Sequence, residues 1–291
     1  MAMRVPGSAP DPNPLPVFRG APRVPRRGSS ESAVIAVAIA LPALAILLTQ
    51  FSFAPLSAEE PVATWKLTRS LPAPEAHQAA AADEKFVYAI ASEKVAKYDR
   101  KTGERVAVST GEAKHLNSGF FLEGKLYLAH SNYPRTPEQS EIRLLDPDNM
   151  ELKIFKDFGN FGGSLTWAVY RDQHWWCNFA HYGTTNERTF LAKFDGEWKE
   201  QGRWTYPPEV LRQIGQASLS GGVWDAETLL VTDHDHQVLY RLKLPAEGKV
   251  LQFVGQEKAP FTGQGIAHDP VTGGLVGIDR GQKQVLFAEQ Q

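Results

Sequence analysis

Histidine and acidic residues recur just after short apolar segments of this 291-residue chain, and further polar residues stand just before other such segments. Five of the eight histidines lie in these two kinds of place. Imidazole and carboxylate groups that meet at one point can hold a divalent metal ion, or can move protons on a polar substrate. The candidate ligand-binding residues are His115, Asn117, His130, Asn132, Tyr133, His181, Tyr182, Asp233, His234, Gln264, Asp279 and Arg280.

Three histidines, His130, His181 and His234, occupy equivalent or nearly equivalent positions after successive apolar segments. Because neutral imidazole is a common zinc ligand, these three are the candidate metal ligands, and a divalent metal is the one cofactor that the sequence suggests. Three alternatives stay open, namely ligand binding without chemistry, acid–base chemistry without a metal, and a structural role in which each histidine caps a strand or bonds to a loop. The sequence assigns no catalytic residue.

The apolar segments repeat at a nearly constant interval, which predicts the elements that position these residues. Five segments end at Asp99, Asp146, Asp195, Lys243 and Gln290, so their ends are 47, 49, 48 and 47 residues apart. A unit of four short strands in roughly 45 residues is typical of a β-propeller blade. A β-sandwich would explain the alternation of apolar and polar residues but not the constant period. We therefore expect an all-β, five-bladed β-propeller over residues 59–291.

This fold would gather the candidate residues on one face. In a propeller, the loops after the second strand of each blade and the loops between blades open on the same face, at one end of the axial channel. The inserted segment Pro207–Gln216 is expected to form one or two helical turns that arch over this face.

The ring is predicted to close through the start of the domain. The fifth unit ends at Gln291 without an outer strand, whereas Thr64–Arg69 precedes the first unit and has strand character. Pairing the two would leave no open edge between the first and last blades. Trp65 and Leu67 are then expected to face the packed side of this closing strand.

The first 58 residues differ in composition from the rest. Residues 1–31 are basic, rich in proline and expected to be disordered. Residues 32–58 contain no charged residue. The apolar stretch Ala33–Leu48 is read as part of a signal peptide or a membrane-anchor helix. The domain should therefore be periplasmic or otherwise extracytoplasmic, either secreted or anchored, and should contact the membrane only if this segment is not cleaved.

Charge and cysteine content exclude several classes of function. The chain carries a net charge of −2, and residues 1–58 contain five arginines against Asp11 and Glu31, so residues 59–291 carry −5. An acidic domain is a poor partner for nucleic acid. The single Cys177 rules out an intramolecular disulfide. A monomer that binds a small polar ligand or a glycan is expected instead.

Several stretches of the chain resemble known proteins. They are His115–Gly119, Tyr127–Tyr133, Gly163–Trp167, Trp175–Tyr182, Ser220–Trp224 and Val231–Tyr240. Through them the chain resembles uncharacterised bacterial exported β-propeller proteins, loosely labelled cycloisomerase-like, and is more distantly similar to the five-bladed glutaminyl cyclases (glutamine cyclotransferases). The cyclase family places an acidic residue near Ala129-His130, where this chain has none.

The resemblance implies a five-bladed fold. The His/Asp-rich face at the axial channel is expected to bind a small polar ligand, and the reaction classes considered for it are metal-assisted hydrolase, lactonase and cyclase-type chemistry. The alternative is a non-catalytic extracytoplasmic module that binds a protein or a glycan, for which exposed tyrosines such as Tyr133 and Tyr182 are suited.

Overall fold

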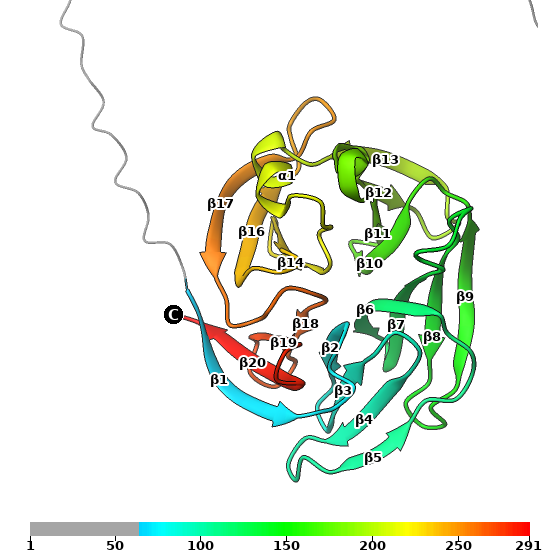
Figure 1. Ribbon diagram of the computed structural model, residues 1–291, viewed down its shortest axis with the longest axis vertical. Coiled ribbons are helices and arrows are strands. Elements are labelled where there is room, and N and C mark those ends of the chain that lie inside the picture. The colour runs from blue at the N-terminus through cyan, green and yellow to red at the C-terminus, as the bar shows by residue number, and fades with distance from the viewer. Residues whose placement is uncertain (1–63) are drawn as a thin grey trace, which may run out of the picture. The chain divides into compact units, whose positions relative to one another are not determined.

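The computed structural model describes residues 64–291, which form a five-bladed β-propeller (Figure 1). Each blade is a four-stranded antiparallel sheet, as the repeat predicts. The expected tail and the signal or anchor segment, residues 1–31 and 32–58, lie outside the described residues. Within the described part, no helix is long and apolar enough to span a membrane.

The strands run outward from the axis in chain order within blades 1 to 4. Blade 1 contains β2 (Ala79–Ala82), β3 (Phe86–Ile90), β4 (Val95–Asp99) and β5 (Arg105–Val108). Blade 2 contains β6 (His115–Leu122), β7 (Lys125–Ser131), β8 (Ser140–Leu145) and β9 (Leu152–Gly159). Blade 3 contains β10 (Ser164–Arg171), β11 (His174–Ala180), β12 (Phe190–Phe194) and β13 (Glu200–Thr205).

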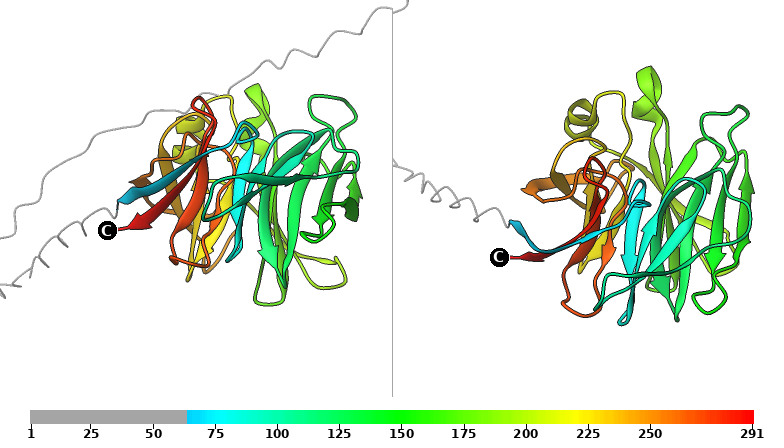
Figure 2. Two further views of the ribbon diagram at one scale, coloured as in Figure 1. Left: turned by 90° about the horizontal axis from the view of Figure 1, so that it is seen from below. Right: turned by 60° about the horizontal axis from the view of Figure 1, so that its bottom comes forward.

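Blade 4 contains β14 (Gly222–Asp225), β15 (Thr228–Thr232), β16 (Val238–Lys243) and β17 (Gln252–Lys258). Blade 5 contains β18 (Ala267–His268), β19 (Leu275–Asp279), β20 (Gln284–Gln290) and, as its outer strand, β1 (Trp65–Pro72). Two short helices, η1 (Gly183–Arg188) and α1 (Pro208–Ile214), rise from one face of the propeller (Figure 2).

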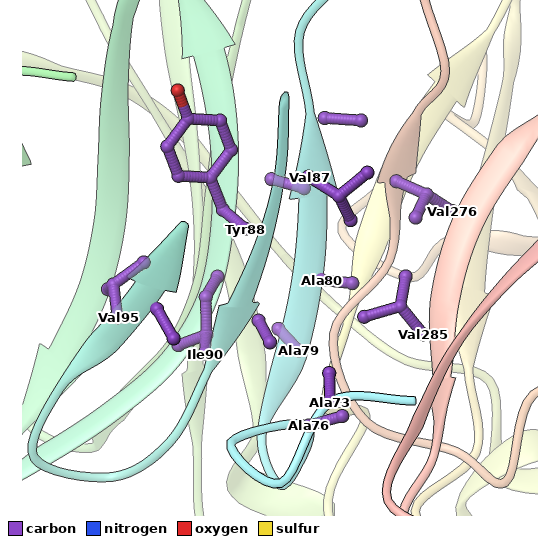
Figure 3. Close-up of a cluster of buried hydrophobic side chains, with 14 of the residues drawn as sticks. Ala73, Ala76, Ala79, Ala80, Val87, Tyr88, Ile90, Val95, Val276 and Val285 are labelled. Carbon is purple, nitrogen blue, oxygen red and sulfur yellow. The ribbon is translucent and has the colours of Figure 1, made fainter. Parts of the chain in front are cut away.

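Small residues occupy the inner strands because neighbouring backbones crowd around the axis. Strand β2 is a run of four buried alanines, and Figure 3 shows Ala80 facing Val276 and Val285 of blade 5. A Cβ atom added at Gly265 would come within 2.6 Å of the Cβ atom of Ala79. At these places a larger side chain would push adjacent blades apart.

Hydrogen bonds near the axis join each blade to the next and hold the loops of one face in fixed positions. From blade 1 onward these bonds are Leu116 N–H to Ser92 O (2.8 Å), Asn117 Nδ2 to Leu165 O (2.8 Å), Thr166 Oγ1 to Leu219 O (3.0 Å), Thr232 Oγ1 to Gln264 O (2.6 Å) and Gly265 N–H to Gln78 O (2.9 Å).

The predicted ring closure is confirmed. Strand β1 pairs antiparallel with β20, from Trp65 opposite Gln290 to Pro72 opposite Gln284 (Figure 1). The expected orientation of Leu67 was wrong, because Leu67 is 52% exposed whereas Trp65 is buried. A bulge between Leu67 and Arg69 interrupts the pairing. Outer strands lie at the rim, where blades diverge, and three of the four residues of β5 and half of those of β9 are exposed for the same reason.

Candidate functional site

A cavity of about 610 Å³ opens at one end of the axis, on the face that carries η1 and α1. All five blades contribute to its lining. The predicted residues that line it are His115, Asn117, Tyr133, Tyr182, His234, Gln264 and Arg280. The inner strand β6 begins beside this cavity and the second strands β7, β11, β15 and β19 end there, so the strand directions place these residues together.

Five other predicted residues do not line the cavity. His130 is buried, and its Nε2 accepts a hydrogen bond of 2.9 Å from the backbone N–H of Lys114. Burial, followed by the charge of Arg143, lowers the pKa of His130 to about 3. The Glu141 carboxylate lies 3.1 Å from Nδ1 of His130 and would favour the charged form, but Arg143 pairs with the same oxygen at 2.7 Å. His130 is therefore neutral and bonded within its own blade.

The remaining four residues shape loops. Asp233 accepts hydrogen bonds from the backbone N–H groups of Asp235 and His236 and from the Tyr240 hydroxyl. Asp279 accepts one from the N–H of Gln282, and Asn132 bonds to both Pro137 and Gln139. His181 is half-buried, and its backbone N–H donates to Thr189 Oγ1 at 3.0 Å. The side chains of Asp233, Asp279 and Asn132 thus satisfy turns, as is common for Asp and Asn, whereas His181 is bonded through its backbone.

The three candidate metal ligands are not brought together around the cavity. Only His234 lines it, since His130 is bonded to Lys114 and His181 lies outside the lining. Within residues 64–291, no group of three histidine, cysteine, aspartate or glutamate side chains is placed to hold a metal ion. Metal binding at these histidines stays a prediction.

Arg280 supplies a positive charge to the cavity. Its Nη2 group donates to Nε2 of His77 at 3.2 Å, and its Nε group approaches the same atom at 3.4 Å. Among the described residues, no carboxylate lies within 4.0 Å of this guanidinium. The guanidinium of Arg280 is thus positioned by the neutral His77, and its positive charge is not balanced by a carboxylate of the described residues.

Two imidazoles near Arg280 are kept neutral. Burial is the main cause that lowers the pKa of His115, and the charges of Arg280 and His77 lower it further. Burial likewise lowers the pKa of His77, with contributions from Arg280 and Lys283. A third imidazole, that of His234, lies 2.7 Å from Asp235 through its Nδ1 atom. Of these, the neutral ring of His115 lines the cavity and can accept a proton or a hydrogen bond there.

Three rings that contact one another line the cavity and are here called the aromatic wall (His115, Tyr133 and Tyr182). The ring centroids of Tyr133 and Tyr182 are 4.6 Å apart, and those of His115 and Tyr133 are 5.4 Å apart. Tyr133 is 39% exposed, while burial raises the pKa of Tyr182. The wall therefore presents a half-open ring face on the side of blades 2 and 3.

Three side-chain amides line the cavity in a shared arrangement, here called the amide triplet (Gln78, Asn117 and Gln264). The nitrogen of each amide donates to the protein, while no described residue donates to its oxygen. The acceptors are Ser92 Oγ at 3.0 Å for Gln78, Leu165 O at 2.8 Å for Asn117 and His234 O at 3.3 Å for Gln264. The cavity is thus rich in hydrogen-bond acceptors.

Sequence reasoning missed several lining residues, namely Gln78, Gln216, Ser218 and Asp235. Gln78 precedes the alanine run of β2, which carries no strand pattern, so blade 1 contributed no candidate. Gln216 follows α1, and its place in the lining confirms that the inserted segment reaches this face. A polar residue just before each inner strand was the signal that could have found Gln78.

A second cavity of about 480 Å³ lies at the opposite ends of the inner strands. Its lining is mainly apolar and aromatic, with Phe120, Phe121, Tyr170 and Trp224. Arg171 and His268 also line it, whereas Arg280, the aromatic wall and the amide triplet all line the first cavity, so the two ends of the axis differ in chemistry.

Comparisons with known proteins support the fold. No protein-family model matches the chain, and neither does any curated protein sequence. Among solved structures, the chain is similar to glutaminyl cyclase from Myxococcus xanthus, with 12% identity and a TM-score of 0.56 over 80% of this chain and 99% of that one. A chain of the mitotic checkpoint complex matches at 10% identity and a TM-score of 0.44, over 82% of this chain and 97% of that one. The similarity to glutaminyl cyclase propellers is thereby confirmed at the level of the fold.

Proposed function

We propose that the cavity binds a small polar ligand that carries a negative charge, such as a carboxylate. The observation that carries this proposal is Arg280, whose guanidinium lines the cavity and has only the neutral His77 as its side-chain partner among the described residues. Guanidinium groups form strong charge-assisted hydrogen bonds with carboxylates. An anionic ligand would complete the ion pair that Arg280 lacks.

The size and construction of the cavity support a small molecule. Its volume of about 610 Å³ lies within the usual range for small-molecule sites. The hydrogen bonds between blades fix the lining loops before a ligand arrives, which reduces the entropy lost on binding.

Binding of small carboxylates to the purified full chain, measured by isothermal titration calorimetry, tests the proposal. Lactate is a suitable first probe. Arg280→Gln should weaken its binding about 10- to 100-fold, which is the range for losing a charged hydrogen bond. Arg203→Gln is the matched control, since Arg203 lies on the outer strand β13 and pairs with Glu200. Equal affinity in the native chain and Arg280→Gln would contradict the proposal.

Cyclase-type chemistry is the reaction class that we propose to test first. It is supported by the fold shared with a glutaminyl cyclase and by the neutral His115, which can accept a proton in the cavity. The assay is ammonia release from a peptide with an N-terminal glutamine. Lactone hydrolysis, with and without a divalent metal, tests the hydrolase and metal-assisted alternatives.

A non-catalytic binding module is the second candidate, supported by the exposed ring of Tyr133 at the cavity mouth. Ligand binding without turnover in any of these assays would favour a module that binds a glycan or a protein.

We further propose that the domain acts outside the cytoplasm, in the periplasm or beyond, and as a monomer. The charge-free stretch of residues 32–58 supports export. Cell fractionation with N-terminal sequencing of the mature chain would show whether the segment is cleaved, and light scattering would give the oligomeric state.

A further inference from the structure

We infer that the ligand class is an acidic sugar, that is, a hexuronic acid or a saccharide that contains one. The inference rests on the proposed function, because it keeps Arg280 as the partner of the carboxylate. It adds two features of the same cavity, the aromatic wall and the amide triplet, which a simple carboxylate would leave unused.

The aromatic wall favours a ligand that contains a ring. Tyr133 packs between Tyr182 and His115, with centroid distances of 4.6 and 5.4 Å and ring planes tilted by 44° and 49°, and leaves an aromatic surface open because Tyr133 is 39% exposed. Such a surface can contact the apolar C–H face of a pyranose or the face of an aromatic ring. Lactate, which has no ring, would contact little of it.

The amide triplet distinguishes a sugar ring from an apolar ring. The oxygens of Gln78, Asn117 and Gln264 accept no hydrogen bond from the described residues. A ligand that satisfies them must supply several O–H or N–H donors. Sugar hydroxyls do so, whereas an apolar ring would displace water from these oxygens without replacing its hydrogen bonds.

The charge and the wall lie on different parts of the cavity lining. Arg280 follows β19 in blade 5, while Tyr133 follows β7 in blade 2 and Tyr182 follows β11 in blade 3. The cavity volume equals that of about 20 water molecules, so a sugar ring fits with water to spare. In the inferred complex the ring of one monosaccharide lies on the wall and its carboxylate faces Arg280.

Calorimetric titration of the full chain with four kinds of probe tests this inference. The probes are hexuronates of three configurations (glucuronate, galacturonate and mannuronate), the corresponding neutral hexoses, cyclohexanecarboxylate and lactate. At least one hexuronate should bind about 10-fold more tightly than its neutral hexose, than cyclohexanecarboxylate and than lactate. The neutral hexose lacks the charge, cyclohexanecarboxylate lacks the hydroxyls and lactate lacks the ring.

Tyr133 provides a matched pair of variants. Tyr133→Ala should weaken hexuronate binding about 3- to 10-fold, the range for one aromatic contact, and should leave lactate binding unchanged. Tyr133→Phe retains the ring and should bind the hexuronate like the native chain. Because Tyr133 is 39% exposed in a loop, the alanine variant should keep the native melting temperature, which is measured alongside.

The outcomes separate the two proposals. If cyclohexanecarboxylate binds as tightly as the best hexuronate, or if no hexuronate exceeds lactate, the acidic-sugar inference is overturned while the carboxylate site stands. If neither lactate nor any hexuronate binds, the proposed function fails as well. An equal loss of lactate and hexuronate affinity in Tyr133→Ala would also overturn the assignment of the wall to a ring.

Discussion

Trp65 ties the closing strand β1 to the neighbouring blade and is the sharpest place to test ring closure. Its side chain is 7% exposed and packs with residues of blades 4 and 5, and its Nε1 donates to Glu257 Oε2 of β17 at 2.6 Å. Truncating a buried tryptophan to alanine costs about 3–5 kcal/mol. Glu257 keeps Arg241 as a partner, so the lost hydrogen bond adds only about 1 kcal/mol. Trp65→Ala should therefore lower the free energy of unfolding by about 4–6 kcal/mol.

The assay is urea unfolding of the full chain, monitored by far-ultraviolet circular dichroism, which does not depend on the removed tryptophan. The melting temperature is measured as well. For a domain of this size, a loss of about 4–6 kcal/mol corresponds to a fall in Tm of roughly 8–24 °C. Leu67→Ala is the control on the same strand, and because Leu67 is 52% exposed it should change stability by no more than about 0.5 kcal/mol. Equal stability of the two variants would refute the reasoning that β1 closes the ring through buried contacts.

Three further predictions concern charged and titratable groups. The pKa of His130 is about 3 in the folded chain and near 6.5 when unfolded, so below pH 6.5 the unfolded chain binds more protons. The free energy of unfolding should therefore fall by about 2 kcal/mol between pH 7 and pH 5. Urea unfolding of His130→Gln should lack this part of the loss. The pKa of His115 should lie below that of an exposed histidine in an NMR titration, and should rise in Arg280→Gln because a nearby positive charge is removed; an unchanged value would show that burial alone sets it. Asp269→Asn should lower the free energy of unfolding, measured in urea, by about 3–5 kcal/mol, because the buried Arg100 guanidinium would lose its charged partner. In the native chain Arg100 Nη2 lies 2.7 and 2.6 Å from the two carboxylate oxygens of Asp269. An unchanged free energy of unfolding would mean that the pair does not contribute to joining blades 1 and 5.

The fold could be predicted because its repeat is visible in the spacing of apolar segments. The segment Val95–Asp99, for example, forms the strand β4 with the expected bounds. Inner strands were harder to place, since crowding at the axis selects small residues, as in Ala79–Ala82, which have little strand preference of their own. Tertiary packing, more than local propensity, makes that run a strand.

The candidate site could be predicted only in part, because equivalent positions in a repeat share a face but not a side-chain direction. Arg280 and His234 line the cavity, whereas their neighbours Asp279 and Asp233 turn back to accept backbone hydrogen bonds within their own loops. Asp and Asn side chains readily bond to nearby backbone groups. Sequence periodicity carries no signal that separates a residue that lines the cavity from a neighbour that bonds within its own loop.

Ring closure by β1 also sets the order of events during synthesis. Leu71 pairs with Val285, so 214 positions of chain separate the two partners, and the backbone N–H of Gln291 donates to the carbonyl of Thr64. At ribosomal rates of about 5–20 residues per second, the last strand is made about 10–40 s after the first. Blades 1 to 4 can each assemble from consecutive strands, whereas blade 5 must wait until β20 has been made. Strand β1, which precedes the other strands of the propeller in the chain, is thus the last that can find its place in a sheet.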